Sequence, residues 1–213
     1  MIEISNVEVF GWEAAIRGMR NPKNSWDKSD SGYCPRYDND PLYFGFKIGP
    51  NDHKLMKTLA NAGDDHGKFL RMINVTLDIN APLYWWKEFD TYKVGTVANS
   101  CSTMHKIHAQ EFVMDDFSHE HNLYYGNLGH TIDALNHARE QYLLTKDKKY
   151  WYSMIQTLPT SYNQKRTVQL NYAVLKNMYN SRRFHKLDEW RNFCEYFIRE
   201  LPYSELITGE ETE

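Results

Sequence analysis

The sequence predicts an α+β fold, because two stretches alternate apolar and polar residues while others repeat apolar residues at helical spacing. The alternation covers residues 2–9 and 69–79 and is typical of strands that bury one face. Helical spacing recurs through the second half of the chain. At 213 residues and 25.3 kDa the chain suits one compact core, and we expect a single domain over residues 1–213.

The N-terminal region begins with the first of these strands and continues into a short helix from Trp12 to Met19. Residues 21–50 contain four prolines with Gly, Asn, Asp and Ser between them, which predicts a long loop. The loop is rich in aromatic residues, so we expect it to pack over a site or a partner subunit. Asn51 or Asp52 is expected to cap a helix that Gly63 stops.

The second half of the chain is predicted to be mainly helical. After the strand at 69–79, Pro82 can open an aromatic-rich helix. No Pro or Gly interrupts residues 160–180, so this stretch is predicted to be one continuous helix opened by Pro159. The other predicted helices cover residues 126–145, 150–155 and 186–200, with Pro202 ending the last one.

Two polar residues stand out in the long predicted helix. Asn171 and Arg182 fall on one face with apolar residues between them, roughly 16 Å apart at 1.5 Å per residue. In one interpretation this is a core helix, whose Asn caps a neighbouring backbone and whose Arg pairs with a carboxylate. In the other, the two polar groups bracket a ligand. The spacing alone leaves both open.

Charge and cysteine content favour an intracellular protein without a disulfide framework. The net charge of −3 gives no general footprint for nucleic acid, and we expect no stable nucleic-acid partner. No apolar run approaches the ~18 residues of a membrane span, so we expect a cytoplasmic protein without a membrane partner. The three cysteines share no CxxC spacing. We interpret Cys34 and Cys194 as structural, and Cys101 either as an accessible nucleophile or as a buried, inert thiol.

Aromatic residues make up 15% of the chain, which predicts that many rings line a pocket or a subunit interface, and hence a homo-oligomer. A His- and carboxylate-rich stretch covers residues 105–121. Its spacings do not place ligands on one helix face as HExxH does, so we predict no metal site.

The interval from Leu158-Pro159 to Asn171, then Asn177, Arg182 and the run at 188–191, resembles the C-terminal part of the flavin-dependent thymidylate synthases (thymidylate synthase complementing proteins). In that family the arginine matching Arg182 contacts the uracil of the nucleotide, and the asparagines matching Asn171 and Asn177 contact the flavin ring. The resemblance implies a small antiparallel sheet flanked by helices, and a homotetramer with sites between subunits.

The central segment resembles the family less closely. If Asn99 is placed on the family's Asn, Ser102 falls on its second Ser, but Ser100 and Met104 replace a Glu and an Arg. The family's Arg-His-Arg falls near Thr91-Tyr92-Lys93, and a Lys point charge substitutes poorly for a bidentate Arg. The residues that match the family's contacts to the flavin and uracil rings are therefore retained better than those that match its contacts to the phosphates. Either another cation compensates, or the ligand differs; the candidate cations are Arg183, Arg166, Lys106 and Arg71.

By resemblance, the chain is an enzyme that transfers a one-carbon unit from methylene-tetrahydrofolate to C5 of a uracil nucleotide, converting dUMP to dTMP with FAD and NADPH. Arg182 has the catalytic role. The nucleotide is assigned to Arg182, Ser102, Asn99 and Glu88, and the cofactor to Asn171, Asn177, Tyr92 and Lys93. For Ser102 the alternative is a cap on the next helix. The alternative function is a nucleotide-binding relative that kept the fold but lost catalysis or changed specificity, and a purely structural oligomer is a third class.

Overall fold

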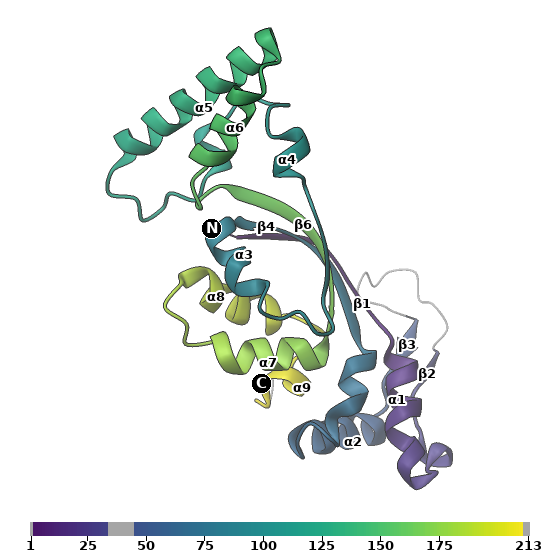
Figure 1. Cartoon of the computed structure of the whole chain (residues 1–213). Helices are drawn as coiled ribbons and strands as arrows, with labels where there is room; N and C mark the ends of the chain where they lie inside the picture. The colour runs from purple at the N-terminus through teal and green to yellow at the C-terminus, as the bar shows by residue number, and fades with distance from the viewer. Residues whose placement is uncertain (1, 34–44, 211–213) are drawn as a thin grey trace. The chain divides into compact units, whose positions relative to one another are not determined.

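The computed structural model describes residues 2–33 and 45–210 and confirms the predicted α+β fold (Figure 1). The larger sheet is a small antiparallel sheet of four strands in the order β1-β4-β6-β5. Its strands are β1 (Glu3–Phe10), β4 (Asn74–Pro82), β6 (Asn163–Asn171) and β5 (Val97–Ser100). A second, two-stranded sheet pairs β2 (Gly32–Tyr33) with β3 (Phe46–Lys47) in antiparallel register.

Strand β4 shows why alternation predicted a strand. Val75, Leu77, Ile79 and Ala81 are fully buried, and the residues between them are only partly covered. The predicted strand began too early, because residues Gly67–Met72 form a 3-10 helix (η3) before the sheet is reached. The first strand is confirmed as β1.

The chain divides into two compact units, and all four strands of the larger sheet contribute residues to both. Unit 1 consists of residues 1–5, 78–91 and 98–168, and unit 2 of residues 6–77, 92–97 and 169–213. The single domain over residues 1–213 stays a prediction.

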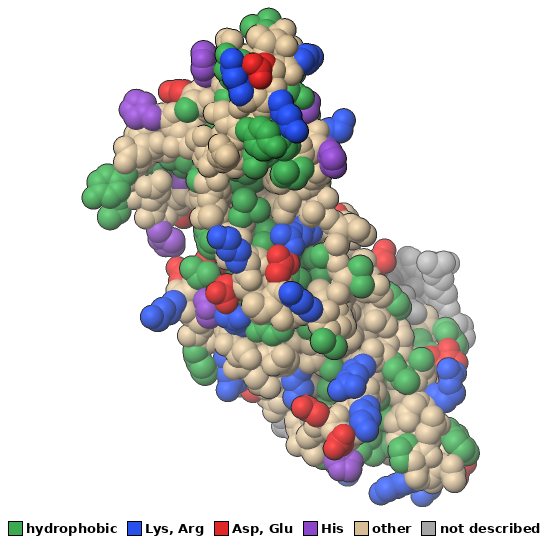
Figure 2. All heavy atoms as spheres, viewed as in Figure 1, with side chains coloured by type: hydrophobic (Ala, Val, Ile, Leu, Met, Phe, Trp, Pro, Cys, Tyr) green, Lys and Arg blue, Asp and Glu red, His purple; other side chains and the backbone are tan. Residues whose placement is uncertain are grey.

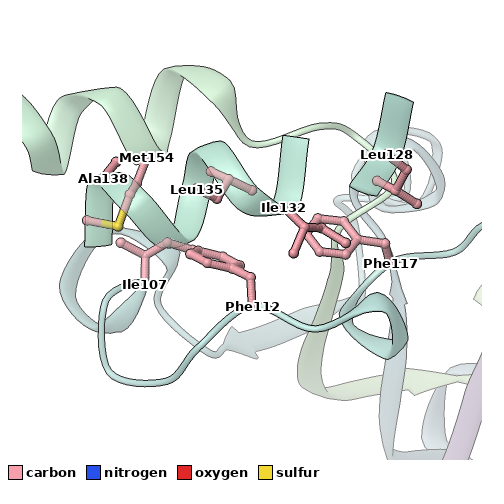
Figure 3. Close-up of a cluster of buried hydrophobic side chains, with 8 residues drawn as sticks. All are labelled: Ile107, Phe112, Phe117, Leu128, Ile132, Leu135, Ala138 and Met154. Atoms are coloured by element: carbon pink, nitrogen blue, oxygen red, sulfur yellow. The ribbon is translucent and has the colours of Figure 1, made fainter. Parts of the chain in front are cut away.

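Unit 1 is built around two apolar clusters. Three rings of α3 (Leu83–Phe89) are buried together, with Trp85 stacked on Phe89 at a centroid distance of 5.2 Å. The second cluster joins α5 (Tyr125–Thr145) and α6 (Lys148–Thr157) to the segment before them (Figure 3). Its members are Ile107, Phe112, Phe117, Leu128, Ile132, Leu135, Ala138 and Met154. Unit 1 also contains the short helices α4 (Thr103–Lys106) and η4 (Met114–Asp116).

Unit 2 holds most of the remaining helices. They are α1 (Trp12–Arg20), η1 (Asn21–Lys23), η2 (Trp26–Lys28), α2 (Pro50–Asn61), η3, α7 (Tyr172–Arg182), α8 (Asp188–Asn192), a π-helical turn (Phe193–Ile198) and α9 (Glu205–Thr208). The predicted final helix is helical from Asp188 to Ile198 and changes from α to π at Phe193, and α9 was not predicted. On the face drawn in Figure 2, Lys and Arg side chains are interspersed with Asp and Glu.

The continuous helix predicted over residues 160–180 is wrong. Residues 163–171 form β6, and the helix begins only at Tyr172. The stretch lacks Gly and Pro, but Val168 and Leu170 are buried with an exposed residue between them, as in a strand. β6 lies between β4 and β5, so the ladders on both sides satisfy its backbone and override the local preference.

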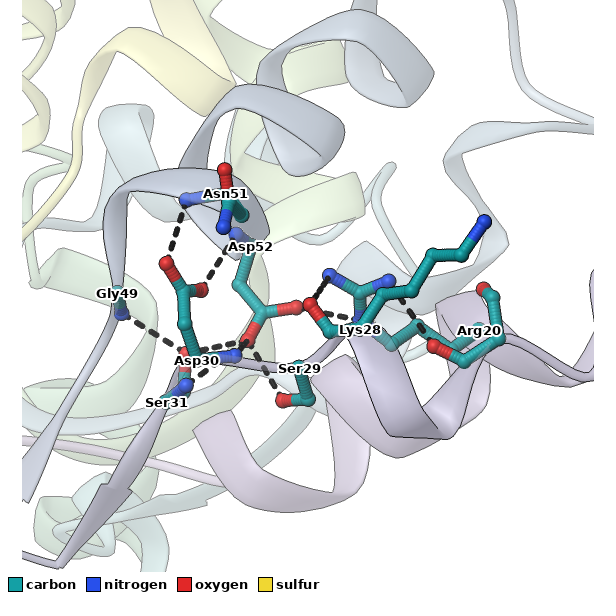
Figure 4. A network of polar contacts seen from close by, with 9 residues as sticks. Arg20, Lys28, Ser29, Asp30, Ser31, Gly49, Asn51 and Asp52 are labelled. Atoms are coloured by element: carbon teal, nitrogen blue, oxygen red, sulfur yellow. Dashed lines mark hydrogen bonds and ion pairs between the residues drawn. The ribbon is translucent and has the colours of Figure 1, made fainter.

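The predicted N-cap of α2 is wrong, whereas its predicted stop is confirmed, because the helix ends at Asn61 and Gly63 follows the C-cap Ala62 with φ +100°. The helix begins at Pro50, and the carboxylate of Asp30 accepts hydrogen bonds from the backbone N–H groups of Asn51 and Asp52 at 2.8 and 3.0 Å (Figure 4). The Asp52 side chain instead turns inward toward Arg20. A residue of the predicted loop thus caps the helix, and this ties the loop to unit 2.

Regular structure is scarce in the described part of the 21–50 loop, as predicted, being limited to short 3-10 turns, β2 and β3. Cys34 and the aromatic residues Tyr37, Tyr43 and Phe44 lie outside the described residues. Whether this loop covers a site or a partner stays a prediction.

Candidate functional site

Helix α7 carries three of the predicted site residues. Asn171 is its N-cap, and the Asn171 Oδ1 accepts a hydrogen bond from the Val174 N–H at 3.1 Å. Arg182 is the last residue of the helix. Leu175 and Met178 on the inner side are fully buried, so the helix is anchored in unit 2. The cap interpretation of Asn171 is thereby confirmed, although the backbone that it caps is that of its own helix.

Residues 92–97 lie along this helix and contact both of its ends. Near the N-terminal end, a Cβ on Gly95 would lie 3.0 Å from Asn171 Nδ2 and 3.1 Å from a Val174 methyl carbon. Gly95 has φ +78°, where other residues are strained. At the other end, Arg182 Nε donates a hydrogen bond to the Tyr92 hydroxyl at 2.9 Å. The structure therefore brings Tyr92 together with Arg182, and Gly95 together with Asn171.

Aromatic rings hold the guanidinium of Arg182. The guanidinium carbon lies 5.5 Å from the centroid of the Tyr92 ring and 5.1 Å from that of Trp190. Trp190 is fully buried, so one wall of this site is fixed. Cation–π contacts of this kind contribute about 0.5–2 kcal/mol, depending on desolvation. The half-buried guanidinium is thus oriented by the Tyr92 hydroxyl and by the rings of Tyr92 and Trp190.

Asn177 faces elsewhere. It lies about 140° around the helix from Arg182, at 100° per residue, and it lines a polar pocket of about 360 Å³ in unit 2 together with Arg71 and Lys176. Lys93 is exposed. The structure therefore does not gather all predicted cofactor residues of unit 2 in one place.

The remaining predicted residues belong to unit 1. The Ser102 Oγ accepts a hydrogen bond from the His105 N–H at 3.0 Å, so Ser102 caps α4, as one of the two interpretations had it. Ser102 also lines a pocket of about 390 Å³ with Lys106 and Lys165. Asn99 is exposed on β5, and Glu88 lies near the end of α3.

The two described cysteines differ. Burial raises the pKa of the Cys194 thiol to about 12, which confirms a structural role. Cys101 is exposed and lines the unit 1 pocket, so its interpretation as a buried, inert thiol is wrong. The reason is that Cys101 directly follows β5, whose residues are all exposed. Exposure makes the thiol accessible without identifying a group that would activate it.

Of the four candidate phosphate-binding cations, two already lie beside a carboxylate and two line pockets. Arg166 Nη1 lies 2.8 Å from an Asp90 carboxylate oxygen, and Arg183 lies 3.6 Å from Glu210. The Arg166 guanidinium is also stacked on Trp86 at 4.2 Å. Lys106 and Arg71 instead line the pockets of unit 1 and unit 2, respectively.

The residues around α7 fit the ring of a flavin, but residues 91–93 do not fit its diphosphate. Toward its ring, Asn171 Nδ2 makes no hydrogen bond with any residue that the structure describes, and the buried Thr96 hydroxyl also lacks a partner there. Buried polar groups without partners are uncommon, so the Thr96 hydroxyl fits a polar ring edge, and the partly exposed Asn171 amide can donate to the same edge. Toward its diphosphate, residues 91–93 supply only the exposed Lys93, which does not fit.

Trp190 and Gly95 were missed as site residues. Trp190 stood in the run that resembles the family, whereas Gly95 had no signal beyond being a glycine in a polar loop. Among residues 2–33 and 45–210, no group of three or more His, Cys, Asp or Glu residues could hold a metal ion. In the same residues no helix is both long and apolar enough to cross a membrane.

No protein-family model and no curated protein matches the sequence. Among solved structures, the chain is similar to thymidylate synthase X (ThyX) from Helicobacter pylori with FAD and dUMP. The two are 16% identical, with a TM-score of 0.73 over 99% of this chain and 98% of that chain. A second structure of flavin-dependent thymidylate synthase ThyX from Helicobacter pylori, complexed with FAD and dUMP, has a TM-score of 0.71 at 16% identity, over 97% and 98% of the two chains. The chain therefore has the fold of the flavin-dependent thymidylate synthases.

Proposed function

We propose that this chain is a divergent flavin-dependent thymidylate synthase, which transfers a one-carbon unit from methylene-tetrahydrofolate to C5 of dUMP. The shared fold supports the proposal, because it extends over nearly the whole of both chains. The neighbouring structures contain FAD and dUMP, and their ligands are the ones that this proposal assigns here. NADPH is the proposed reductant of the flavin.

The geometry of Arg182 carries the proposal. Its Nε donates to Tyr92 and its guanidinium lies over Trp190, so the group has a defined orientation, in which we assign it a hydrogen bond to a carbonyl oxygen of the uracil ring. A fixed guanidinium beside this ring stabilises negative charge on its oxygen without reorganising during the reaction. In this role Arg182 both binds the nucleotide and favours its anionic form.

Asn171 and Gly95 are proposed to receive the flavin ring. Asn171 is held by its capping bond, so its Nδ2 can donate in a fixed direction. The absence of a side chain at Gly95 leaves the backbone of residues 92–97 close to Asn171. When bound, the reduced flavin supplies the hydride, and the protein contributes orientation and electrostatics. Asn177, Ser102, Asn99 and Glu88 remain proposed contacts of the flavin or nucleotide.

A second function is favoured by the residues that stand where the family has its phosphate-binding arginines. Tyr92 stands in the region of the family's Arg-His-Arg, and Arg166 and Arg183 are each paired with a carboxylate. A relative that kept the fold and a pyrimidine site, but binds another nucleotide or does not catalyse, would tolerate these changes. The two functions differ in whether a flavin is bound.

The visible absorption spectrum of the purified protein, before and after addition of FAD, tests the proposal. We expect the visible absorption peaks of a bound flavin, and we expect them to shift when dUMP is added because the nucleotide would change the surroundings of the ring. An Arg182→Ala variant is the matched control and should keep the peaks but lose the shift. A protein that ignores both FAD and dUMP would contradict the proposal. A protein that binds dUMP without FAD would favour the second function.

The proposed assembly is a homotetramer in the cytoplasm. The exposed rings support an interface, since Tyr33, Tyr124 and Tyr196 are each more than 70% exposed. Light scattering coupled to size exclusion should give about four times the mass of one chain. A monomer at micromolar concentration would remove the assembly from the proposal.

A further inference from the structure

A polar pocket of about 360 Å³ in unit 2 has the chemistry of an anion site. It lies where the C-terminal end of α2 and the η3 segment meet α7. Two cationic side chains, Arg71 and Lys176, face one carboxylate, Asp64. The carboxamides of Asn177 and Asn180 complete the polar lining. The lining is therefore positively charged and supplies both charged and neutral donors.

The positive charge of this pocket is not neutralised by a close ion pair. Within the described part of the chain, Arg71 makes no hydrogen bond or ion pair. Lys176 Nζ donates to the carbonyl oxygen of Ala60, which is a neutral group. Burial lowers the pKa of Lys176, and Asp64 only partly opposes this. Arg166 and Arg183 differ from this pair, because each already has a carboxylate partner.

Small residues keep the pocket open. Ala60, Gly63, Gly67 and Ala173 line it, and no atom lies within 4 Å of the position of a Cβ on Gly63. Phosphate oxygens need donors that can approach from several sides, which a wall of large side chains would prevent.

We propose that Arg71 and Lys176 form a binding site for the diphosphate group of a nucleotide or dinucleotide. The site would replace the cations that residues 91–93 lack. The inference deepens the proposed function and rests on it where the ligand is FAD, since Asn177 of the same pocket is a proposed flavin contact. The free diphosphate of a nucleotide is the other source of the same chemistry.

Calorimetric titration of inorganic pyrophosphate into the full-length protein tests the site directly. Arg71→Gln and Lys176→Gln should each weaken binding about tenfold, because each removes one charge-assisted contact. Asp64→Asn should strengthen binding, because it removes the opposing carboxylate. Lys54→Gln is the matched control, since it removes an exposed charge from α2 outside this pocket and should change affinity less than about twofold.

Flavins with and without phosphate distinguish the two possible sources of the diphosphate, which are FAD and a nucleotide. If FAD is the ligand, Arg71→Gln should weaken FAD binding about tenfold and leave riboflavin, which has no phosphate, unchanged. If pyrophosphate and ADP bind and no flavin does, the site holds and the proposed function fails. If pyrophosphate does not bind and FAD binds equally well to wild type, Arg71→Gln and Lys176→Gln, the site is overturned and the proposed function stands. Loss of affinity in Asp64→Asn would also overturn it, because this is the behaviour of a cation site.

Discussion

Arg20 and Arg182 both end a helix of unit 2, but their surroundings differ. Arg20 is 4% exposed, and all three of its nitrogens donate: Nε to Asp52 at 2.6 Å, and the two Nη groups to the carbonyl oxygens of Ser25 and Lys28 at 3.1 and 2.9 Å (Figure 4). Arg182 is half-buried, donates its Nε to the Tyr92 hydroxyl and lies over two rings.

The difference separates a structural arginine from the arginine that we propose binds the nucleotide. The Asp52 carboxylate also accepts hydrogen bonds from Ser29 and Ser31 at 2.7 Å, so the Arg20 cluster is saturated and ties the loop to α1 and α2. A saturated buried network holds structure, and removing one partner leaves a buried charge. The rings around Arg182 orient its planar guanidinium, as recognition of a planar ligand requires. The comparison therefore predicts that Arg20 variants lose stability and Arg182 variants lose binding.

The largest effect is expected at the Arg20 cluster. Asp52→Ala leaves the Arg20 charge buried without its partner and should lower the free energy of unfolding by about 3–5 kcal/mol. Urea denaturation measures this. Asp65→Ala is the control, because Asp65 is 94% exposed and its pair with Lys68 at 3.4 Å should contribute less than about 1 kcal/mol. Equal losses in the two variants would break the comparison.

The same cluster predicts that the stability of the folded protein falls at acidic pH. Burial raises the pKa of Asp52, but hydrogen bonds from Ser31, Ser29 and Arg20 outweigh it, so the pKa is lowered overall. The folded protein therefore binds this proton less readily than the unfolded chain does. The stabilisation is present above the ordinary aspartate pKa of about 3.9 and is lost as the pH falls through the lower folded value. Melting curves between pH 6 and 3 should show this loss, and Asp52→Asn should reduce it.

The next effect concerns Arg182. Arg182→Ala should weaken binding of uracil nucleotides by about 1.5–3 kcal/mol, because a charge-assisted pair is lost in a partly dry site. Arg182→Lys should recover little, since an ammonium does not reproduce the fork. Calorimetric titration of dUMP, with melting curves alongside, checks both. A variant that loses stability and keeps its affinity would place Arg182 in the same class as Arg20.

The capping role of Asn171 and its proposed role in flavin binding can be separated. Asn171→Ala removes the cap and should lower stability by about 1 kcal/mol. Asn171→Asp keeps a capping oxygen and suits the positive end of the helix dipole, so its stability should match wild type. It loses the Nδ2 donor, however, and should bind flavin more weakly. Unchanged flavin affinity in Asn171→Asp would show that Asn171 only caps the helix and does not bind the flavin.

The smallest effect is expected for the Tyr92 hydroxyl. Tyr92→Phe keeps the ring beside the Arg182 guanidinium and removes one hydrogen bond, so dUMP binding should weaken by about 0.5–1.5 kcal/mol. Flavin binding tests the neighbouring Lys93: if this exposed cation alone met the diphosphate, FAD binding would be weak and would fall further with added salt. Tighter, less salt-sensitive FAD binding is expected if the diphosphate binds at Arg71 and Lys176 instead.

The sequence by itself determined the local features of this protein. Alternation identified β1 and β4, because burial of one face has a period of two. Helices α1, α3, α5 and α6 followed from their apolar spacing and from prolines and glycines at their ends. The eleven-residue interval between Asn171 and Arg182 singled out both ends of α7, although the helix was predicted to begin twelve residues too early.

Only the tertiary structure decided where these residues meet. Residues 163–171 became a strand because β4 and β5 bind their backbone on both sides. Asp52 became a buried partner of Arg20, and Gly95 and Tyr92 came to lie against the two ends of α7. Each of these results depends on residues 30 or more positions apart in the chain. A local pattern reports the preference of a segment, whereas pairing and burial between distant segments determine which preference is realised.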